Sequence, residues 1–138
     1  MKIGSKLFAA RVENLTEASG FVEECADRFG LDAGKKFGLL LALEEAFVNI
    51  CSYAYPHGEG AAQITCTGDG DLFVLEITDR GEPVDLLSLP DPDLTSDLME
   101  RRIGGLGIHF IRTLSDSVAY RREDKRNILR MEFRGRAR

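Results

Sequence analysis

The spacing of apolar positions predicts two helices early in the chain. In residues 16–30 apolar side chains recur three and four apart, with Thr16 as the expected N-cap and Gly30 at the expected end. A second helix is expected to begin after Asp32 and to end at residues 56–58. It is apolar around most of its circumference, so most of it should be buried, with Phe37, Leu41, Phe47 and Val48 on its main stripe.

Alternation with a period of two predicts strands in the rest of the chain. We expect a short first strand at residues 6–12. Two hairpins should follow, one from 63–67 and 73–79 around a turn at 68–70, the other from 118–122 and 128–133 around a turn at 123–127. In the strand 73–79 the parity places Asp79 on the same face as Phe73 and Ile77, so the face that packs on the helices ends in a carboxylate.

Residues 85–102 interrupt this pattern, because they contain few periodic apolar positions. A connection of this length inside a compact domain is usually functional and often a lid. It leads through Gly104, Gly105 and Gly107 into a short amphipathic helix expected at 108–114. Glycines at a helix start let backbone amides approach an anion, and the helix dipole favours phosphate there. The dinucleotide-binding fingerprint does not fit, since no strand directly precedes the glycines and their spacing differs.

Size and composition predict one globular domain spanning residues 1–138. Hydrophobic residues make up 43% and charged residues 30% of the chain. The formal net charge of -5 argues against a general nucleic-acid surface. No apolar run of signal-peptide or membrane-spanning length is expected, so we predict a cytoplasmic protein without a membrane contact. Three cysteines without metal-ligand spacing are expected to be buried or partly buried thiols: Cys25, Cys51 and Cys66.

One sector of the second helix differs from the rest, because its residues are small or polar: Gly38, Ala42, Glu45, Asn49, Ser52 and Tyr53. Glu45 and Asn49 are four residues apart and stand one above the other. On a buried helix this pair needs a partner from elsewhere, and Mg²⁺ with a phosphate ligand would serve. A solvated groove or a hydrogen bond to a neighbouring loop is the alternative. Glu44 is expected to project into the apolar stripe.

Like the pair Glu45 and Asn49, Asp79 allows one interpretation with a ligand and one without. A carboxylate at the end of a strand can cap the turn that follows, here Arg80-Gly81-Glu82-Pro83. Alternatively, it accepts a hydrogen bond from an amine of a ligand.

Three motifs occur in order along the chain: Glu-x-x-x-Asn on a buried helix, Asp-x-Gly at a strand end and Gly-x-Gly at a helix start. Together they resemble the N box and the two glycine boxes of the ATP-binding fold shared by gyrase, heat-shock chaperones, histidine kinases and mismatch-repair proteins. Within this superfamily the stretches 43–49, Leu-Glu-Glu-Ala-Phe-Val-Asn, and 104–112, Gly-Gly-Leu-Gly-Ile-His-Phe-Ile-Arg, are similar to the stand-alone anti-sigma-factor serine/threonine kinases. The resemblance covers nearly the whole chain.

The resemblance implies an α+β fold of the Bergerat type. This is a two-layer α/β sandwich with a mixed, mostly antiparallel sheet, three helices on one face and ATP between the layers. By motif position, Asp79 would accept from the adenine amino group, Asn49 would ligate Mg²⁺ and Glu45 would be the general base. Gly81 would shape the adenine surface. The remaining implied nucleotide contacts surround the second glycine box: Arg101, Arg102, Gly104, Gly105, Leu106 and Gly107.

Three positions depart from the family pattern. The first glycine box ends Gly81-Glu82-Pro83, where the kinases commonly have a third glycine. Tyr53 stands where many members carry a histidine after the N box. Ile103 and Gly104 separate Arg101 and Arg102 from the second glycine box.

The resemblance also implies a function. The protein would use ATP and Mg²⁺ to phosphorylate a serine or threonine of a small partner of the anti-anti-sigma kind, and would sequester a second partner, with a sigma factor as the candidate. It further suggests a homodimer. One alternative is a nucleotide-binding protein-interaction module without kinase activity. The other, the catalytic part of a histidine kinase, requires a helical dimerisation segment with a phosphorylated histidine, for which this sequence has no room.

Overall fold

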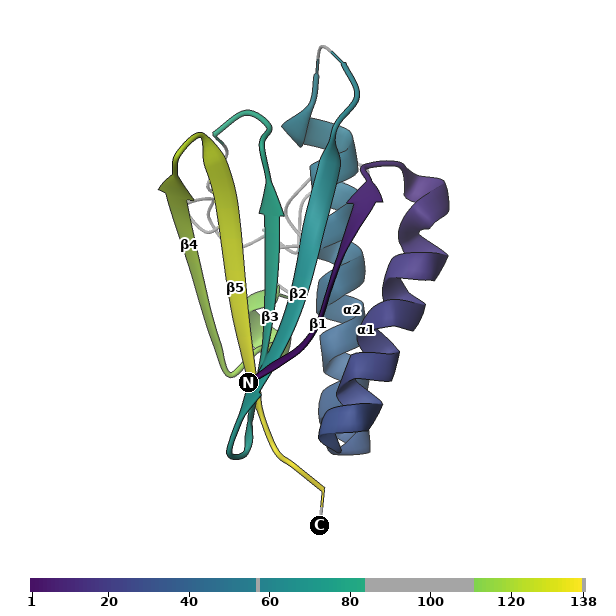
Figure 1. Ribbon diagram of the computed structural model, residues 1–138, viewed down its shortest axis with the longest axis vertical. Coiled ribbons are helices and arrows are strands. Elements are labelled where there is room, and N and C mark those ends of the chain that lie inside the picture. The colour runs from purple at the N-terminus through teal and green to yellow at the C-terminus, as the bar shows by residue number, and fades with distance from the viewer. Residues whose placement is uncertain (57, 84–110, 138) are drawn as a thin grey trace, which may run out of the picture.

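The computed structural model describes residues 1–56, 58–83 and 111–137. In these residues five strands form one sheet, and two long helices lie along one of its faces (Figure 1). The strands are β1 (Lys2–Ala9), β2 (Ala61–Asp69), β3 (Leu72–Asp79), β4 (Ser117–Glu123) and β5 (Arg126–Arg134). Their order in the sheet is β1-β2-β3-β5-β4. Every pairing between described strands is antiparallel, so the expected α+β sandwich is confirmed but the parallel pairing of a mixed sheet is not found among them.

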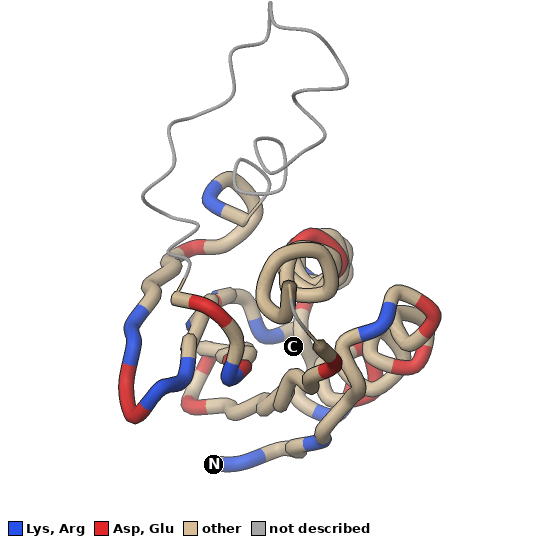
Figure 2. Tube along the Cα trace, turned by 90° about the horizontal axis from the view of Figure 1, so that it is seen from above, with Lys and Arg blue, Asp and Glu red and all other residues tan. Residues whose placement is uncertain are grey.

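The helices are α1 (Leu15–Phe29), preceded by the short 3-10 turn η1 (Val12–Asn14), and α2 (Ala33–Asn49), which continues as one π-helical segment, η2 (Ile50–Ala54). Seen from above, α1 and α2 stand side by side along the sheet (Figure 2). Residues 111–114 are helical again, and Leu114 packs on α2 at Gly38, where a Cβ would lie 3.4 Å from the Leu114 Cβ. A glycine in the second turn of α2 therefore makes room for the helical residues 111–114.

The predicted helix ends are partly confirmed. Gly30 ends α1 with a left-handed φ of 84°, a conformation that favours glycine. The Asp32 side chain caps α2 by accepting from the Gly34 N–H at 2.9 Å. The N-cap prediction at Thr16 is wrong, since α1 begins at Leu15. Asn14 precedes it and donates from Nδ2 to the Ala9 carbonyl instead of capping the helix.

The first strand lies earlier than predicted, at Lys2–Ala9. Ala9 pairs with Ala61, which is the first residue of β2, so the chain beyond Ala9 has no neighbouring strand to extend the pairing. Residues 10–12 turn into η1 instead. The boundary is thus fixed by a partner that lies far away in the sequence.

Both hairpins are present, and their turns are short. β2 and β3 are joined at Gly70, which has a φ of 63°, and Asp71. β4 and β5 are joined at Asp124 and Lys125, both with positive φ, as two-residue hairpin turns of this kind require. The predicted parity of β3 is confirmed, because Phe73, Leu75, Ile77 and Asp79 are all buried.

The buried face of α2 is rotated from the predicted stripe. Phe47 is fully buried together with Leu39 and Leu43, whereas Phe37 is 67% exposed. Glu44 is exposed as well, so the expectation that it projects into the apolar stripe is wrong. The sheet and α1 select which apolar positions are covered, and a helix that is apolar nearly all round does not reveal that choice.

Two further expectations concern composition. The cysteines are free thiols, with Cys25 and Cys66 buried and Cys51 half-buried, as predicted. By length and composition the helical run Ala33–Ala54 could cross a membrane, contrary to the sequence-based expectation. In the structure this run is the core helix, and half of it is buried against the sheet and α1.

Candidate functional site

Asp79 and Asn49 meet in the gap between α2 and the sheet. Asp79 is the last residue of β3 and is 6% exposed; Asn49 is the last residue of α2 and is 7% exposed. Both line a cavity of about 40 Å³. A second cavity of about 30 Å³ lies deeper, against Ile77 and Leu129, and also reaches Asp79. Cavities of this size hold a few waters or the edge of a ligand. The structure therefore places two of the predicted site residues, Asp79 and Asn49, around one small cavity.

The Asp79 carboxylate is held by two internal hydrogen bonds. Its Oδ1 accepts from the Gly81 N–H and from Asn127 Nδ2, each at 2.9 Å. The first bond confirms that Asp79 caps the turn after β3. No contact from the described residues reaches Oδ2, so the same carboxylate retains an acceptor. The two interpretations of Asp79 are therefore compatible, one for each oxygen.

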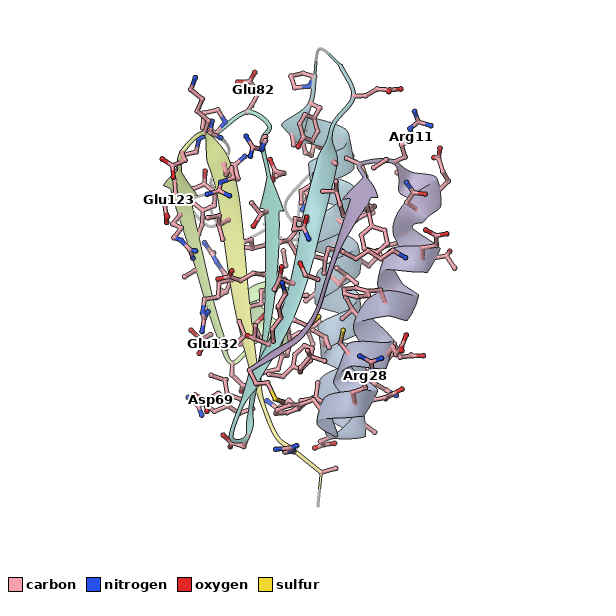
Figure 3. The ribbon with its side chains drawn as sticks, viewed as in Figure 1. Arg11, Arg28, Asp69, Glu82, Glu123 and Glu132 are labelled. Atoms are coloured by element: carbon pink, nitrogen blue, oxygen red, sulfur yellow. The ribbon has the colours of Figure 1, made fainter. Side chains whose placement is uncertain are left out.

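Gly81 packs directly on the end of η2. A Cβ at this position would overlap the Ala54 carbonyl oxygen and lie 2.5 Å from the Ala54 Cβ, so only glycine fits. The next residue fastens the turn, because the Glu82 N–H donates to the same carbonyl at 2.8 Å. Glu82 itself projects outward at the end of the molecule (Figure 3). The turn is thus fixed at Gly81 without a third glycine.

Asn127 is a site residue that the sequence analysis missed. It lies on β5 directly opposite Asp79 and is 6% exposed. Besides Asp79, its Nδ2 donates to the Glu82 carbonyl at 2.8 Å. Its Oδ1 accepts from the Tyr120 hydroxyl at 2.6 Å and from Arg122 at 3.0 Å. Asn127 therefore joins the carboxylate to the turn that follows it. The available signal was a polar residue immediately before the alternating strand pattern of residues 128–133.

Asn49 has an unsatisfied amide. Its Nδ2 is buried and has no hydrogen-bond partner among the residues that the structure describes. A buried polar group left unpaired costs roughly 1 to 3 kcal/mol, which a ligand oxygen accepting from Nδ2 would recover. The side-chain oxygen would at the same time suit a hard cation such as Mg²⁺. This donor set fits the metal-bound phosphate that the motif implies.

Glu45 lies one helical turn before Asn49 and is half-buried. Burial, and secondarily the negative charge of Glu44, raise the pKa of the Glu45 carboxyl above its usual value. None of the described residues donates a hydrogen bond to it or forms an ion pair with it. A carboxylate of raised pKa is a better proton acceptor than an ordinary one.

The phosphate end of the predicted site lies outside the described residues. The predicted contact residues that lie outside the described ranges are Arg101, Arg102, Gly104, Gly105, Leu106 and Gly107. Within residues 1–56, 58–83 and 111–137, no group of three or more His, Cys, Asp or Glu side chains could hold a metal ion. A magnesium ion at Asn49 would therefore depend on oxygen atoms of its ligand. Tyr53, which replaces the common histidine, is 38% exposed and borders the 40 Å³ cavity.

Comparison with known proteins identifies a family and relatives of this chain. The family model of the histidine kinase-like ATPase domain matches residues 8–133. The serine/threonine-protein kinase BtrW of Bordetella bronchiseptica is 31% identical over 115 residues, which span 83% of this chain and 81% of BtrW. Most of both proteins is therefore included in the match.

A solved structure agrees with this chain in fold. The catalytic domain of the histidine kinase ThkA superposes with a TM-score of 0.56, at 13% identity, over 96% of this chain and 97% of that domain. The histidine kinase AdeS of Acinetobacter baumannii gives a TM-score of 0.49, also at 13% identity, over 99% of this chain and 70% of that one. The likeness to ThkA concerns the fold alone.

Proposed function

Because the chain belongs to the histidine kinase-like ATPase domain family, which implies ATP binding, we propose that it is a serine/threonine protein kinase that uses ATP and Mg²⁺. The observation that supports this most strongly is a donor and an acceptor on one cavity: the buried Asn49 Nδ2, which has no partner among the described residues, and Asp79 Oδ2, whose carboxylate accepts its hydrogen bonds from the described residues through Oδ1. The similarity to BtrW, whose name describes a serine/threonine-protein kinase, favours protein phosphorylation among the activities of the family.

In this proposal, Asp79 recognises the base. Its free Oδ2 accepts from the amino group of adenine, while Oδ1 stays occupied by Gly81 and Asn127. An acceptor held in one orientation at a buried site discriminates against a base without an amino group, because such a base would leave the carboxylate unpaired. The specificity for adenine thus follows from the internal contacts of the carboxylate.

Asn49 and Glu45 serve the other end of the nucleotide. Bound Mg²⁺ supplies charge neutralisation for the phosphates. The Asn49 oxygen holds the ion, and its Nδ2 donates to a ligand oxygen. The Glu45 carboxylate accepts the proton of the partner's hydroxyl as the hydroxyl oxygen bonds to the γ-phosphorus and the bond to the β–γ bridging oxygen breaks, leaving ADP. These roles require Glu45 and Asn49 on one side of one helix, which is where they lie.

The partner is a protein with a serine or threonine acceptor. We propose a small protein of the anti-anti-sigma kind as the substrate and a second, sequestered partner, with a sigma factor as the candidate. A homodimer and a cytoplasmic location are part of the same proposal. The homodimer rests on the resemblance of the sequence motifs to the anti-sigma-factor kinases, and the location rests on the pattern of apolar residues in the sequence.

The test is phosphoryl transfer in a lysate of the source cells. The purified protein is incubated with ATP labelled at the γ-phosphate and Mg²⁺, and label is expected on a serine or threonine of one small protein. Asp79→Asn, which should bind ATP at least about 30-fold more weakly, serves as the control for other kinases in the lysate when ATP is kept below the concentration that this variant needs. If nucleotide binds but no label is transferred to a partner, the protein is a nucleotide-binding interaction module instead.

A further inference from the structure

The helices α1 and α2 cover one face of the sheet (Figure 2). The other face has a groove of its own. Its volume is about 710 Å³, within the range of ligand-binding sites. It crosses four strands, because its lining includes Leu7 of β1, Gln63 and Thr65 of β2, Thr78 of β3 and Arg126 of β5. By strand parity these side chains point away from the buried core. We call this hollow the outer groove.

Two arginines face each other at one end of the outer groove. The register pairs Asp79 with Asn127, so the adjacent residues Arg80 and Arg126 come opposite each other, and both line the groove. The Arg80 side chain has no ion pair with the described residues. Among the residues that the structure describes, Arg126 pairs with Asp124 alone, at 3.8 Å, and that carboxylate is 85% exposed. Like charges opposite each other in a sheet destabilise it, and a bound anion would relieve this repulsion.

The rest of the groove offers hydrogen bonds and one apolar contact. On its floor, Gln63 Nε2 donates to Ser5 Oγ at 2.6 Å, and Ser5 and Thr65 share a hydrogen bond of 2.8 Å. Leu7 is 61% exposed at the side formed by β1. The lining has two acidic residues, and both are engaged: Glu59 is paired with Arg11 at 2.8 Å, and the Asp79 carboxylate, which is 6% exposed, accepts from the Gly81 N–H and from Asn127 Nδ2. The described lining therefore has two arginines with little acidic compensation, in a protein whose formal net charge is -5.

We propose that the outer groove binds an acidic, extended segment of a protein partner, with its carboxylates on Arg80 and Arg126. A groove that spans four strands is far larger than one phosphate or carboxylate ion, and its apolar side at Leu7 suits a side chain of a polypeptide. The identity of the partner as the kinase substrate rests on the proposed function, whereas the groove and its charge do not.

The location links the two sites. Asp79 lines both the 40 Å³ cavity beside Asn49 and the outer groove, and the next residue, Arg80, lines the outer groove, so the proposed nucleotide and partner sites adjoin at consecutive residues. The Arg80 N–H donates to the Tyr55 hydroxyl at 2.9 Å, and that hydroxyl donates to the Ala61 carbonyl at 2.6 Å. The backbone between the two sites is therefore braced from both β2 and the segment after η2.

The probe is fluorescein-labelled hexaglutamate, and its binding is measured by fluorescence anisotropy at low and at physiological salt. Wild-type protein is expected to bind it, more weakly as salt screens the charges. The double variant Arg80→Gln/Arg126→Gln should bind at least about tenfold more weakly. The matched control, Arg28→Gln/Lys36→Gln, removes the same charge from the helical side and should bind as the wild type does, since each of these cations already has an acidic partner.

A second pair of variants locates the peptide. Leu7→Glu adds a carboxylate to the groove and should weaken binding, whereas Leu7→Gln should not. The proposal is overturned if hexaglutamate does not bind the wild type at low salt, or binds both double variants equally. It is also overturned if inorganic phosphate displaces the peptide at a concentration equal to that of the peptide's carboxylates. The same holds if the arginine substitutions convert a dimer of this protein into monomers. ADP affinity is measured in parallel. Peptide binding without ADP binding or phosphoryl transfer would refute the proposed kinase and leave the groove intact.

Discussion

Replacing Asp79 with asparagine tests the adenine site at a single atom. The substituted side chain has one carbonyl oxygen and one NH2 group in place of two acceptors. Two donors already converge on the Oδ1 position, the Gly81 N–H and Asn127 Nδ2, each at 2.9 Å. The carbonyl oxygen of the asparagine must therefore occupy that position, and its NH2 group must point to where the adenine amino group would lie. A donor then faces a donor.

The expected loss of affinity follows from this orientation. Two polar groups are left unpaired on binding, and each costs roughly 1 to 3 kcal/mol. The sum, roughly 2 to 6 kcal/mol, corresponds to a loss of roughly 30-fold to 10⁴-fold in ADP affinity. The internal bonds persist but lose their charge assistance, so the free energy of unfolding should fall by only about 1 to 2 kcal/mol. The fold should therefore remain intact.

The assay is isothermal titration calorimetry with ADP and Mg²⁺, accompanied by thermal unfolding of each variant. Asp71→Asn is the matched control, because this exposed carboxylate lies in the turn between β2 and β3 and should leave ADP affinity unchanged. The assignment of Asp79 to adenine is refuted if Asp79→Asn is folded and binds ADP within about threefold of the wild type.

Three further predictions concern the surroundings of this carboxylate. Asn127→Ala removes the hydrogen bonds that Nδ2 donates to the Asp79 carboxylate and to the Glu82 carbonyl. The ADP affinity measured by calorimetry should therefore fall by at least about tenfold. An unchanged affinity would exclude a positioning role for Asn127. Gly81→Ala should lower the free energy of unfolding by about 1 to 3 kcal/mol through overpacking, measured by urea denaturation, whereas Gly20→Ala, with open space around its Cβ, should not destabilise the protein. Glu44→Gln removes a charge that raises the pKa of the Glu45 carboxyl, so the acid limb of the pH–rate profile for phosphoryl transfer should move to lower pH; a limb that stays in place would separate Glu45 from the reaction.

Features that depend on local backbone chemistry could be predicted from the sequence. Gly30 ends α1 and Asp32 caps α2 because a left-handed residue and a short acceptor are needed at those positions, whatever the rest of the chain does. The parity of β3 likewise follows from alternation alone, and it placed Asp79 on the buried face. The sequence motifs therefore predicted both Asp79 and Asn49, which line one cavity in the structure.

Features that depend on distant partners could not be predicted in the same way. β1 ends where β2 begins to pair with it, and Glu44 is exposed because the sheet covers a different side of α2. Asn127 was missed because its role arises from the register that brings β5 beside β3. Burial does not follow from a helix that is apolar on nearly every side, and register is set only when strands meet.

The most direct test of the proposed kinase compares the wild type with two neighbouring carboxylate variants, Glu45→Gln and Glu44→Gln, acting on the labelled partner after its purification. The account predicts similar transfer by the wild type and Glu44→Gln, and a rate about 10² to 10⁴ lower for Glu45→Gln with unchanged ADP affinity, because only the base is lost. Transfer by Glu45→Gln at the wild-type rate would contradict the account.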